Sequence, residues 1–286
     1  MKKLPARLPS LADAAAGLKR RIAQLGATPG EAPFELPQTP FDKYYRKKLL
    51  NKLDLRLVNE KSVLEVGCGA GDLLKAASTF QPKELYGVDQ SAEAIELARQ
   101  YLKGVDVDLD VAPVSALPFP GQSFDMVFVM FELQYIPNHD LLPVIEEVCR
   151  VARQWVVLIE ETAGKVQMGD GLIYRPVELY KEAFKTQKFH LRQTSYLDVA
   201  FSRSLFSGSN QPWQWLRWIF SPLLYLLGFP SSWMKPPLSG DELPPLKPAG
   251  QFQKLFLSLS SGFDDILPAS KGITIMRFER EKLFRR

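Results

Sequence analysis

Three glycines at alternate positions, Gly67, Gly69 and Gly71, directly follow the apolar run Val63–Val66, whose single acid is Glu65. Such a run is typical of a buried parallel strand, and the residues after Gly71 favour a helix. A strand, a tight glycine turn and a helix N-terminus together form a nucleotide-binding corner, because glycine lets a ligand approach the backbone without meeting a Cβ atom. The free N–H groups of the first helical turn add hydrogen-bond donors.

The glycine spacing differs from that of a dinucleotide-binding dehydrogenase. The pattern is Gly-x-Gly-x-Gly, whereas the dinucleotide turn is Gly-x-Gly-x-x-Gly, so a dehydrogenase is not expected. A second apolar run ends in Asp89, about 20 residues further on, where a ribose-binding carboxylate belongs. A carboxylate has enough lone pairs to accept hydrogen bonds from both ribose hydroxyls.

A third segment, Leu117–Asp125, reads Leu-Pro-Phe-Pro-Gly-Gln-Ser-Phe-Asp and leads into the apolar run Met126–Met130. With these segments, residues 63 to 161 resemble the class I S-adenosylmethionine-dependent methyltransferases, whose core reads VLEVGCGxG, GVD and LPFP followed by SFD. The resemblance covers the middle part of the chain and is specific for the cofactor, S-adenosyl-L-methionine. It implies a Rossmann-like α/β fold with a seven-stranded, mostly parallel sheet, helices on both faces and an antiparallel last strand.

The resemblance also implies a set of cofactor-binding residues. The glycines would let the amino-acid part of the cofactor pass close to the backbone, Glu65 would reach its ammonium group and Asp89 its ribose. Otherwise, Glu65 is an acid at a sheet edge. The full set is Glu65, Gly67, Cys68, Gly69, Gly71, Asp89, Gln90, Val114, Ser115 and Met130.

The adenine contact departs from the family pattern. Pro113 stands where relatives commonly have an acid, and proline brings neither a carboxylate nor an N–H donor. We therefore expect Val114 and Ser115 to offer backbone groups to the base, with Asp110 as a substitute acid or a solvent-facing residue.

The candidate catalytic residues are Glu132, Tyr135 and His139, which follow the fourth expected strand. In open parallel sheets, ligands sit outside the carboxyl ends of the strands. A sulfonium methyl is already activated, so the protein must mainly hold the acceptor in line, and a base helps when the acceptor is a hydroxyl. His139 also fits a plain helix-start residue.

Other residues near the expected strand ends are weaker candidates. Glu160 and Glu161 are further possible bases, and Tyr174 with Arg175 could contact an acidic group on a substrate. His190 is interpreted as structural. The sequence holds no metal-ligand spacing, so no metal site is expected.

The composition fits a globular protein, with 46% hydrophobic and 24% charged residues. A net charge of +4 falls short of a concentrated basic stripe, so nucleic acid is not an expected partner. The two cysteines form no disulfide or zinc pattern, and the N-terminus lacks the apolar core of a signal peptide. A cytoplasmic, reducing setting is the plain interpretation.

The elements that must position these residues alternate in type, as a parallel sheet requires. Helices are expected near 72–80, 91–102, 138–151 and 176–187, and strands near 62–66, 84–88, 105–111, 125–130, 155–160, 189–199 and 273–278. A further helix is expected over 41–57, where Tyr45 and Arg46 are either cofactor-lid residues, as in the family, or ordinary surface residues.

Four parts of the chain are expected. Residues 1–40 hold a basic amphipathic helix over 10–25 and a proline-rich linker, residues 41–199 form the core, and residues 271–286 supply the last strand. Residues 200–270 are an insertion with Trp213, Trp215, Trp218 and Trp233.

The segment 212–230 within the insertion is too short and too interrupted for a transmembrane helix. It either caps the active site with an apolar pocket wall or contacts a membrane surface at the headgroup level. Both interpretations favour a hydrophobic acceptor and leave open a cytoplasmic protein that is peripheral at the membrane.

The predicted function is methyl transfer from S-adenosylmethionine to oxygen or carbon of a small, lipid-, quinone- or polyketide-like acceptor. Two alternatives remain open at this point. One is a methyltransferase for a sugar or glycan intermediate, and the other is a non-catalytic membrane-associated binding or assembly protein that keeps the fold. The sequence gives no oligomeric state.

Overall fold

The computed structural model describes residues 40–169, 171–197 and 272–281 of the chain. These residues divide into two compact units, one made of 50–196 with 272–281 and the other of 40–49 with Leu197. The expected boundaries at 40, 199 and 270 remain predictions. The expected helix over 10–25, the insertion 200–270 and its segment 212–230 lie outside the described residues.

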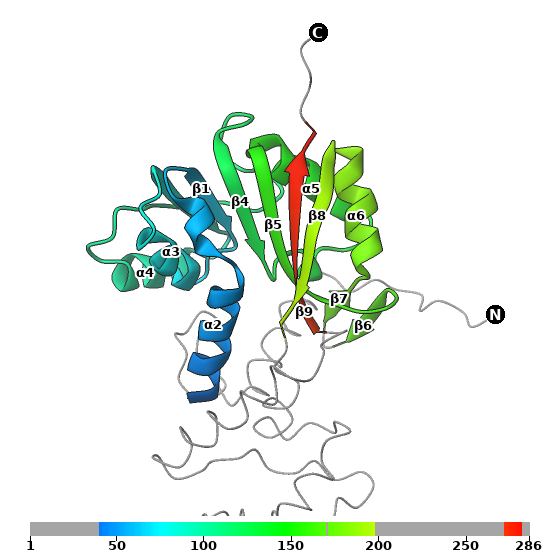
Figure 1. Cartoon of the computed structure of the whole chain (residues 1–286), viewed down its shortest axis with the longest axis horizontal. Helices are drawn as coiled ribbons and strands as arrows, with labels where there is room; N and C mark the ends of the chain where they lie inside the picture. The colour runs from blue at the N-terminus through cyan, green and yellow to red at the C-terminus, as the bar shows by residue number, and fades with distance from the viewer. Residues whose placement is uncertain (1–39, 170, 198–271, 282–286) are drawn as a thin grey trace, which may run out of the picture. The chain divides into compact units, whose positions relative to one another are not determined.

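The expected seven-stranded α/β sheet is confirmed (Figure 1). Its strand order is β3-β2-β1-β4-β5-β9-β8, with parallel pairing from β3 through β5 and antiparallel pairing of β9 with both of its neighbours. The strands are β1 (Ser62–Val66), β2 (Glu84–Asp89), β3 (Asp108–Val111), β4 (Phe124–Met130), β5 (Ala152–Thr162), β8 (Phe189–Tyr196) and β9 (Gly272–Arg280).

Helices cover both faces of the sheet, so its central strands consist largely of apolar residues. Strand β1 is buried at every position, as expected for a central parallel strand. Leu64 and Val66 of β1 belong to the core that also holds α5 (Leu141–Val151) and α6 (Val177–Thr186). Successive strand residues face opposite ways, so Glu65 points to the other face. On that face Leu74 of α3 (Asp72–Ser78) fills the space beside Gly87 of β2.

Local sequence accounts for the helix bounds. The Ser91 hydroxyl caps α4 (Ala92–Tyr101) by accepting a hydrogen bond from the Ala94 N–H at 3.2 Å. Helix α5 begins at Leu141, later than expected, because a turn closed by the Asp140 N–H and the Pro137 carbonyl precedes it. The helix expected over 41–57 is divided into α2 (Pro40–Lys52) and the 3₁₀ helix η1 (Leu55–Val58), because Asp54 adopts a left-handed backbone.

One short element was not expected. Residues after Glu161 form a β-hairpin of β6 (Gln167–Gly169) and β7 (Leu172–Tyr174), where the sequence indicates a loop. This hairpin delivers Arg175 to the sheet, where its backbone bridges Thr162 at the end of β5.

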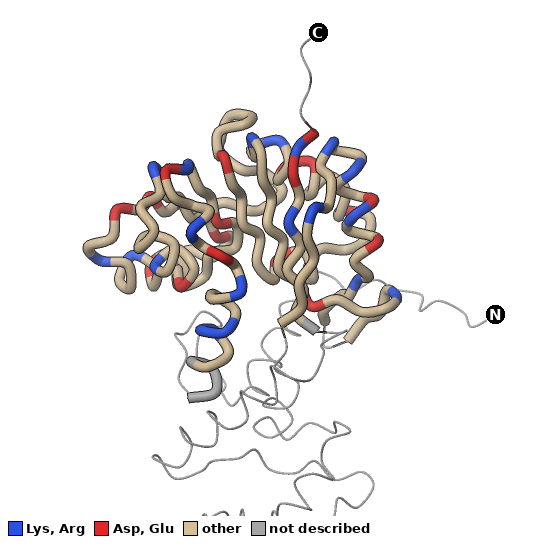
Figure 2. Tube along the Cα trace, viewed as in Figure 1, with Lys and Arg blue, Asp and Glu red and all other residues tan. Residues whose placement is uncertain are grey.

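Positively and negatively charged residues are mixed along the described helices and strands (Figure 2). Lys and Arg are spread along the described helices and strands with Asp and Glu between them. Among the described helices, none is long and apolar enough to cross a membrane.

The antiparallel half of the sheet depends on a stacked pair, Phe184 of α6 and Phe278 of β9, with ring centroids 4.1 Å apart and no exposed surface. We expect Phe278→Ala to lower the free energy of unfolding by about 3–5 kcal/mol, the usual cost of emptying an aromatic site in a core. Leu142→Ala on the exposed side of α5 should change it by no more than about 0.5 kcal/mol. Chemical denaturation followed by circular dichroism measures both, and equal midpoints for the two variants would contradict this packing.

Candidate cofactor and active site

The glycine turn joins β1 to α3 through three left-handed residues. Gly67, Gly69 and Gly71 have φ angles of 73°, 52° and 87°, a region that residues with a Cβ atom rarely adopt. The N–H groups of Gly67 and Cys68 both donate to the Val88 carbonyl, at 2.8 and 3.0 Å. The turn is therefore fastened to the carboxyl end of β2, beside Asp89.

Asp89 is nearly buried and supports two loops at once. Its Oδ2 accepts a hydrogen bond from the Gly69 N–H at 3.0 Å, and its Oδ1 accepts one from the Ser91 N–H at 2.9 Å. Burial raises the pKa of Asp89, and these two hydrogen bonds oppose the rise. Each carboxylate oxygen retains lone pairs for a ligand hydroxyl, as a ribose contact requires.

Glu65 has no exposed surface, and neither of its carboxyl oxygens has a hydrogen-bond partner among the described residues. Burial raises the pKa of Glu65 well above its ordinary value; the Leu74 backbone opposes this rise and Asp89 adds to it. An unpartnered acid in a buried position is costly, so its retention beside the glycine turn points to a polar or cationic ligand.

Glu132 lies directly over the glycine turn. A Cβ atom added at Gly67 would overlap the Cγ and Oε1 atoms of Glu132, so the two residues are in close contact. Burial, with a smaller contribution from Asp89, raises the pKa of Glu132 to about 8. The structure thus brings together the carboxyl groups of Glu65, Asp89 and Glu132, from the ends of β1, β2 and β4.

The segment that carries Glu132 is held by buried polar groups. Phe131 takes a left-handed backbone with φ 58°, and its N–H donates to the Ile159 carbonyl. In the 3₁₀ helix η2 (Leu133–Tyr135), the Leu133 N–H donates to Glu160 Oε1 at 2.7 Å. Burial of Glu160 raises its pKa well above the ordinary value.

Arg175 fastens the same segment from the other side. Its guanidinium has no exposed surface and donates to the carbonyls of Leu133 and Ile136 and to Asn138 Oδ1. The expectation that Arg175 contacts an acidic group on the substrate does not fit this geometry, because its donors are directed at the chain itself. The expectation that Glu160 is a base is likewise replaced by a role in holding η2.

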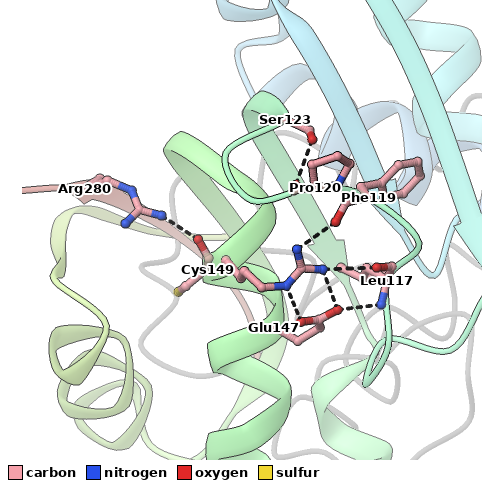
Figure 3. A network of polar contacts seen from close by, with 8 residues as sticks. Leu117, Phe119, Pro120, Ser123, Glu147, Cys149 and Arg280 are labelled. Carbon is pink, nitrogen blue, oxygen red and sulfur yellow. Dashed lines mark hydrogen bonds and ion pairs between the residues drawn. The ribbon is translucent and has the colours of Figure 1, made fainter.

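The Leu-Pro-Phe segment is held by α5 (Figure 3). Glu147 accepts a hydrogen bond from the Leu117 N–H at 2.6 Å, and Arg150 donates to the carbonyls of Leu117 and Phe119 at 3.1 and 2.7 Å. Glu147 and Arg150 also pair with each other at 2.7 Å. Arg150 of α5 thus fixes the loop that follows β3.

The remaining predicted cofactor residues lie around this edge. The Ala112 N–H donates to the Asp89 carbonyl at 3.0 Å, so the segment with Val114 and Ser115 starts next to Asp89. Val114 is buried and Ser115 exposed. Gln90 is exposed beyond β2, Met130 is half-buried at the end of β4, and Cys68 is buried, with a pKa that burial raises.

The catalytic candidates differ in exposure and in contacts. His139 is exposed, with its Nε2 3.2 Å from Asp140 Oδ2, and it lies in the turn before α5, as a helix-start residue would. Tyr135 is half-buried at the end of η2. Of the three, Glu132 is the residue whose contact with the glycine turn is defined. His190 is on β8, 3.6 Å from Glu281, away from this edge of the sheet.

Two supporting residues have no clear signal in the sequence. Glu147 and Tyr180 are polar side chains that the tertiary structure engages or buries beside the loops of the candidate site. The acid-arginine spacing of Glu147 and Arg150 in an amphipathic helix predicts a surface pair, and it gives no sign that both reach a distant loop.

The contact between Gly67 and Glu132 can be tested against a matched glycine. Gly104 has φ 86° and nothing within 4 Å of an added Cβ atom, so Gly104→Ala carries only the left-handed penalty, about 1–2 kcal/mol. We expect Gly67→Ala to lower the free energy of unfolding by more than Gly104→Ala, because Glu132 must also move. Denaturation curves measure the free energy of unfolding of both variants. Equal decreases would mean that the Glu132 side chain moves away from Gly67 without a cost in stability.

Comparison with known proteins matches this site to a family. The sequence profile of a methyltransferase domain matches residues 63–154. The demethylmenaquinone methyltransferase of Shouchella clausii (strain KSM-K16) is 30% identical over 116 residues, which are 39% of this chain and 48% of that protein. The ubiquinone biosynthesis O-methyltransferase of Thiobacillus denitrificans (strain ATCC 25259 / T1) is 36% identical over 99 residues, 31% of this chain and 42% of that protein. These matches span less than half the length of either relative.

A solved structure extends the likeness of fold beyond the matched segment. The crystal structure of magnesium protoporphyrin IX methyltransferase from Synechocystis PCC 6803 with bound S-adenosylhomocysteine has a TM-score of 0.51 and 12% identity, covering 93% of this chain and 94% of that one. At that identity the likeness concerns the fold alone. Together, the profile match and this likeness show that residues 63–154 match a methyltransferase domain and that the described chain has the fold of a methyltransferase.

Proposed function

We propose that the protein transfers the methyl group of S-adenosylmethionine to oxygen or carbon of a small, hydrophobic acceptor. The observation that supports this most directly is the buried Glu65 carboxyl group without a partner, next to Asp89 and the glycine turn. The cofactor carries an ammonium group and a ribose diol, which are the groups that such a pair of acids can bind. The residues present therefore fit the cofactor.

Each residue at the site has a defined task in this proposal. The glycine turn leaves room for the ligand beside the backbone, Asp89 accepts the ribose hydroxyls, and Glu65 accepts the ammonium group. When bound, the cofactor supplies an activated sulfonium methyl. Glu132, at the end of β4 over Gly67, is the candidate to accept the proton of a hydroxyl acceptor, since a base with a pKa near the working pH is the most effective.

The acceptor class rests on relatives and on the insertion. The demethylmenaquinone and ubiquinone enzymes, a fatty-acid O-methyltransferase of Mycolicibacterium smegmatis and a 27-O-demethylrifamycin SV methyltransferase of Amycolatopsis mediterranei act, by their names, on small and largely apolar molecules. The apolar segment 212–230 suits such an acceptor, as a pocket wall or a membrane contact. Peripheral membrane association is part of the proposal.

Neither alternative function gains support. The sugar or glycan interpretation relied on Tyr174 and Arg175, and the Arg175 donors are directed at η2 and Asn138. The non-catalytic interpretation would accept loss of the cofactor groups, yet Glu65, Asp89 and the left-handed glycines are all in place.

The cofactor half of the proposal predicts the effect of removing Asp89. We expect Asp89→Ala to weaken S-adenosylmethionine binding by about 1–3 kcal/mol, because ribose hydroxyls lose their acceptor. Asp106→Ala changes an exposed acid between α4 and β3 that has no place in the candidate site, and it serves as the control. Calorimetric titration measures both, with circular dichroism to verify folding. Unchanged affinity in a folded Asp89→Ala protein would exclude the ribose role.

The acceptor half is tested with lipid. The wild-type protein should form S-adenosylhomocysteine when supplied with S-adenosylmethionine and a lipid or quinone extract, and it should float with anionic vesicles. Replacement of residues 212–230 by a short flexible linker should reduce both readings. If flotation and turnover both survive the replacement, the hydrophobic-acceptor proposal is wrong, and if no extract yields product, the non-catalytic interpretation replaces it.

A further inference from the structure

The carboxyl groups of Glu65, Asp89 and Glu132 form a cluster that has no cationic counterpart in the described part of the chain. Burial raises the pKa values of both Glu65 and Glu132 and Asp89 adds to both rises, so Asp89 interacts with each of the other two acids. No salt bridge to any of the three forms among the described residues. Glu65 is fully buried and both of its carboxyl oxygens lack a partner among the described residues, which favours a ligand that supplies hydrogen bonds to the cluster.

Among the described residues, the titratable groups that interact with Glu132 come from three places and are all acidic or neutral. They are Asp89 from β2, Glu160 from β5 and Cys68 from the glycine turn. The nearest buried cation, Arg175, acts on Glu160 and donates to Leu133, Ile136 and Asn138. The described residues therefore offer no counter-charge to an ionised Glu132, and a cationic ligand would supply one.

Glu65 and Glu132 cannot have the same task. The methionine ammonium is present in both S-adenosylmethionine and S-adenosylhomocysteine, so an acid that binds it does not distinguish the two. The two molecules differ at sulfur, which is a cationic sulfonium in the first and a neutral thioether in the second. Glu132 follows the end of β4 and contacts Gly67 of the turn that would hold the cofactor, so it is the acid left to respond to that difference.

Building on the proposed function, we propose that the Glu132 carboxylate is the counter-charge for the sulfonium of S-adenosylmethionine, so that it gives up its proton when the charged cofactor binds and keeps it when the neutral product binds. The proton passes to solvent on binding. When a hydroxyl acceptor is methylated, the acceptor oxygen would form the new bond to the methyl carbon while the bond from that carbon to sulfur breaks and leaves its electron pair on sulfur. The acceptor proton would pass to Glu132. Sulfur and carboxylate thus lose their charges in the same step.

The sign of the linkage follows from the position of Glu132. Its pKa is about 8 without ligand, so most of the population is protonated at neutral pH. A nearby cation favours the ionised form and lowers that pKa, so binding of the charged molecule is strengthened as pH rises toward 8. Binding of S-adenosylhomocysteine lacks this dependence at Glu132.

The experiment is calorimetric titration of the full chain with S-adenosylmethionine, S-adenosylhomocysteine and sinefungin, whose amine replaces the sulfonium methyl. Each titration is repeated at neutral pH in buffers of different ionisation enthalpy, which gives the number of protons released. We expect wild-type protein to release more protons with S-adenosylmethionine and sinefungin than with S-adenosylhomocysteine. Below pH 8, the affinity for S-adenosylmethionine relative to that for S-adenosylhomocysteine should increase by up to about tenfold for each unit that the pH rises.

Two variants separate Glu132 from other acids. Glu132→Gln keeps the size of the side chain, and we expect it to abolish both the excess proton release and the pH dependence of the ratio. Glu146→Gln, an exposed position on α5, should preserve both. Protons released equally by all ligands belong to Glu65 or Asp89 and cancel in the comparison.

The outcomes distinguish this inference from the function on which it rests. If none of the three ligands binds, the proposed cofactor is wrong. If they bind but wild-type proton release does not differ between the charged and neutral ligands, or if the difference persists in Glu132→Gln, the counter-charge role is overturned while the cofactor assignment stands.

Discussion

Burial of carboxyl groups at one edge of the sheet is the constraint on which the rest of the site depends. Strands β1, β2 and β4 run in parallel, so their carboxyl ends deliver Glu65, Asp89 and Glu132 to the same place. Removing such groups from water raises their pKa values and costs free energy. A fold that accepts this cost gains a site suited to a cationic ligand with hydroxyl groups.

The loops around that edge are fixed by polar contacts that come from the other half of the domain. Arg175, delivered by the β6–β7 hairpin, and Glu160 of β5 satisfy backbone groups of η2 and so set the position of Glu132. Glu147 and Arg150 of α5 do the same for the Leu-Pro-Phe segment (Figure 3). Backbone groups in a loop with no strand partner need such acceptors and donors, because an unpaired buried group is expensive.

The apolar runs and the turn residues of the sequence predict most of the fold. Val63–Val66, Gly67, Gly69 and Gly71 specify a buried strand that ends in a left-handed turn, and the structure confirms both. The β6–β7 hairpin has no signal in the sequence, because its strands are only three residues long and carry no clear alternation. The residues around Asp54 predict one continuous helix, but the left-handed backbone of Asp54 separates α2 from the 3₁₀ helix η1.

By itself, the sequence determined the local chemistry, which comprises a glycine turn, an acid at the end of the second strand and a methyltransferase-like core. Each of these features consists of contiguous residues whose conformational preferences are local. Only the tertiary structure decided that Glu132 lies over Gly67 and that Arg175 holds η2. Those relations join residues that are far apart in the chain. Parallel pairing of β1 with β4 brings Gly67 beside Glu132, and the bridge to Thr162 places Arg175 at the end of β5, which pairs with β4. No local pattern encodes which distant backbone group a buried side chain will satisfy.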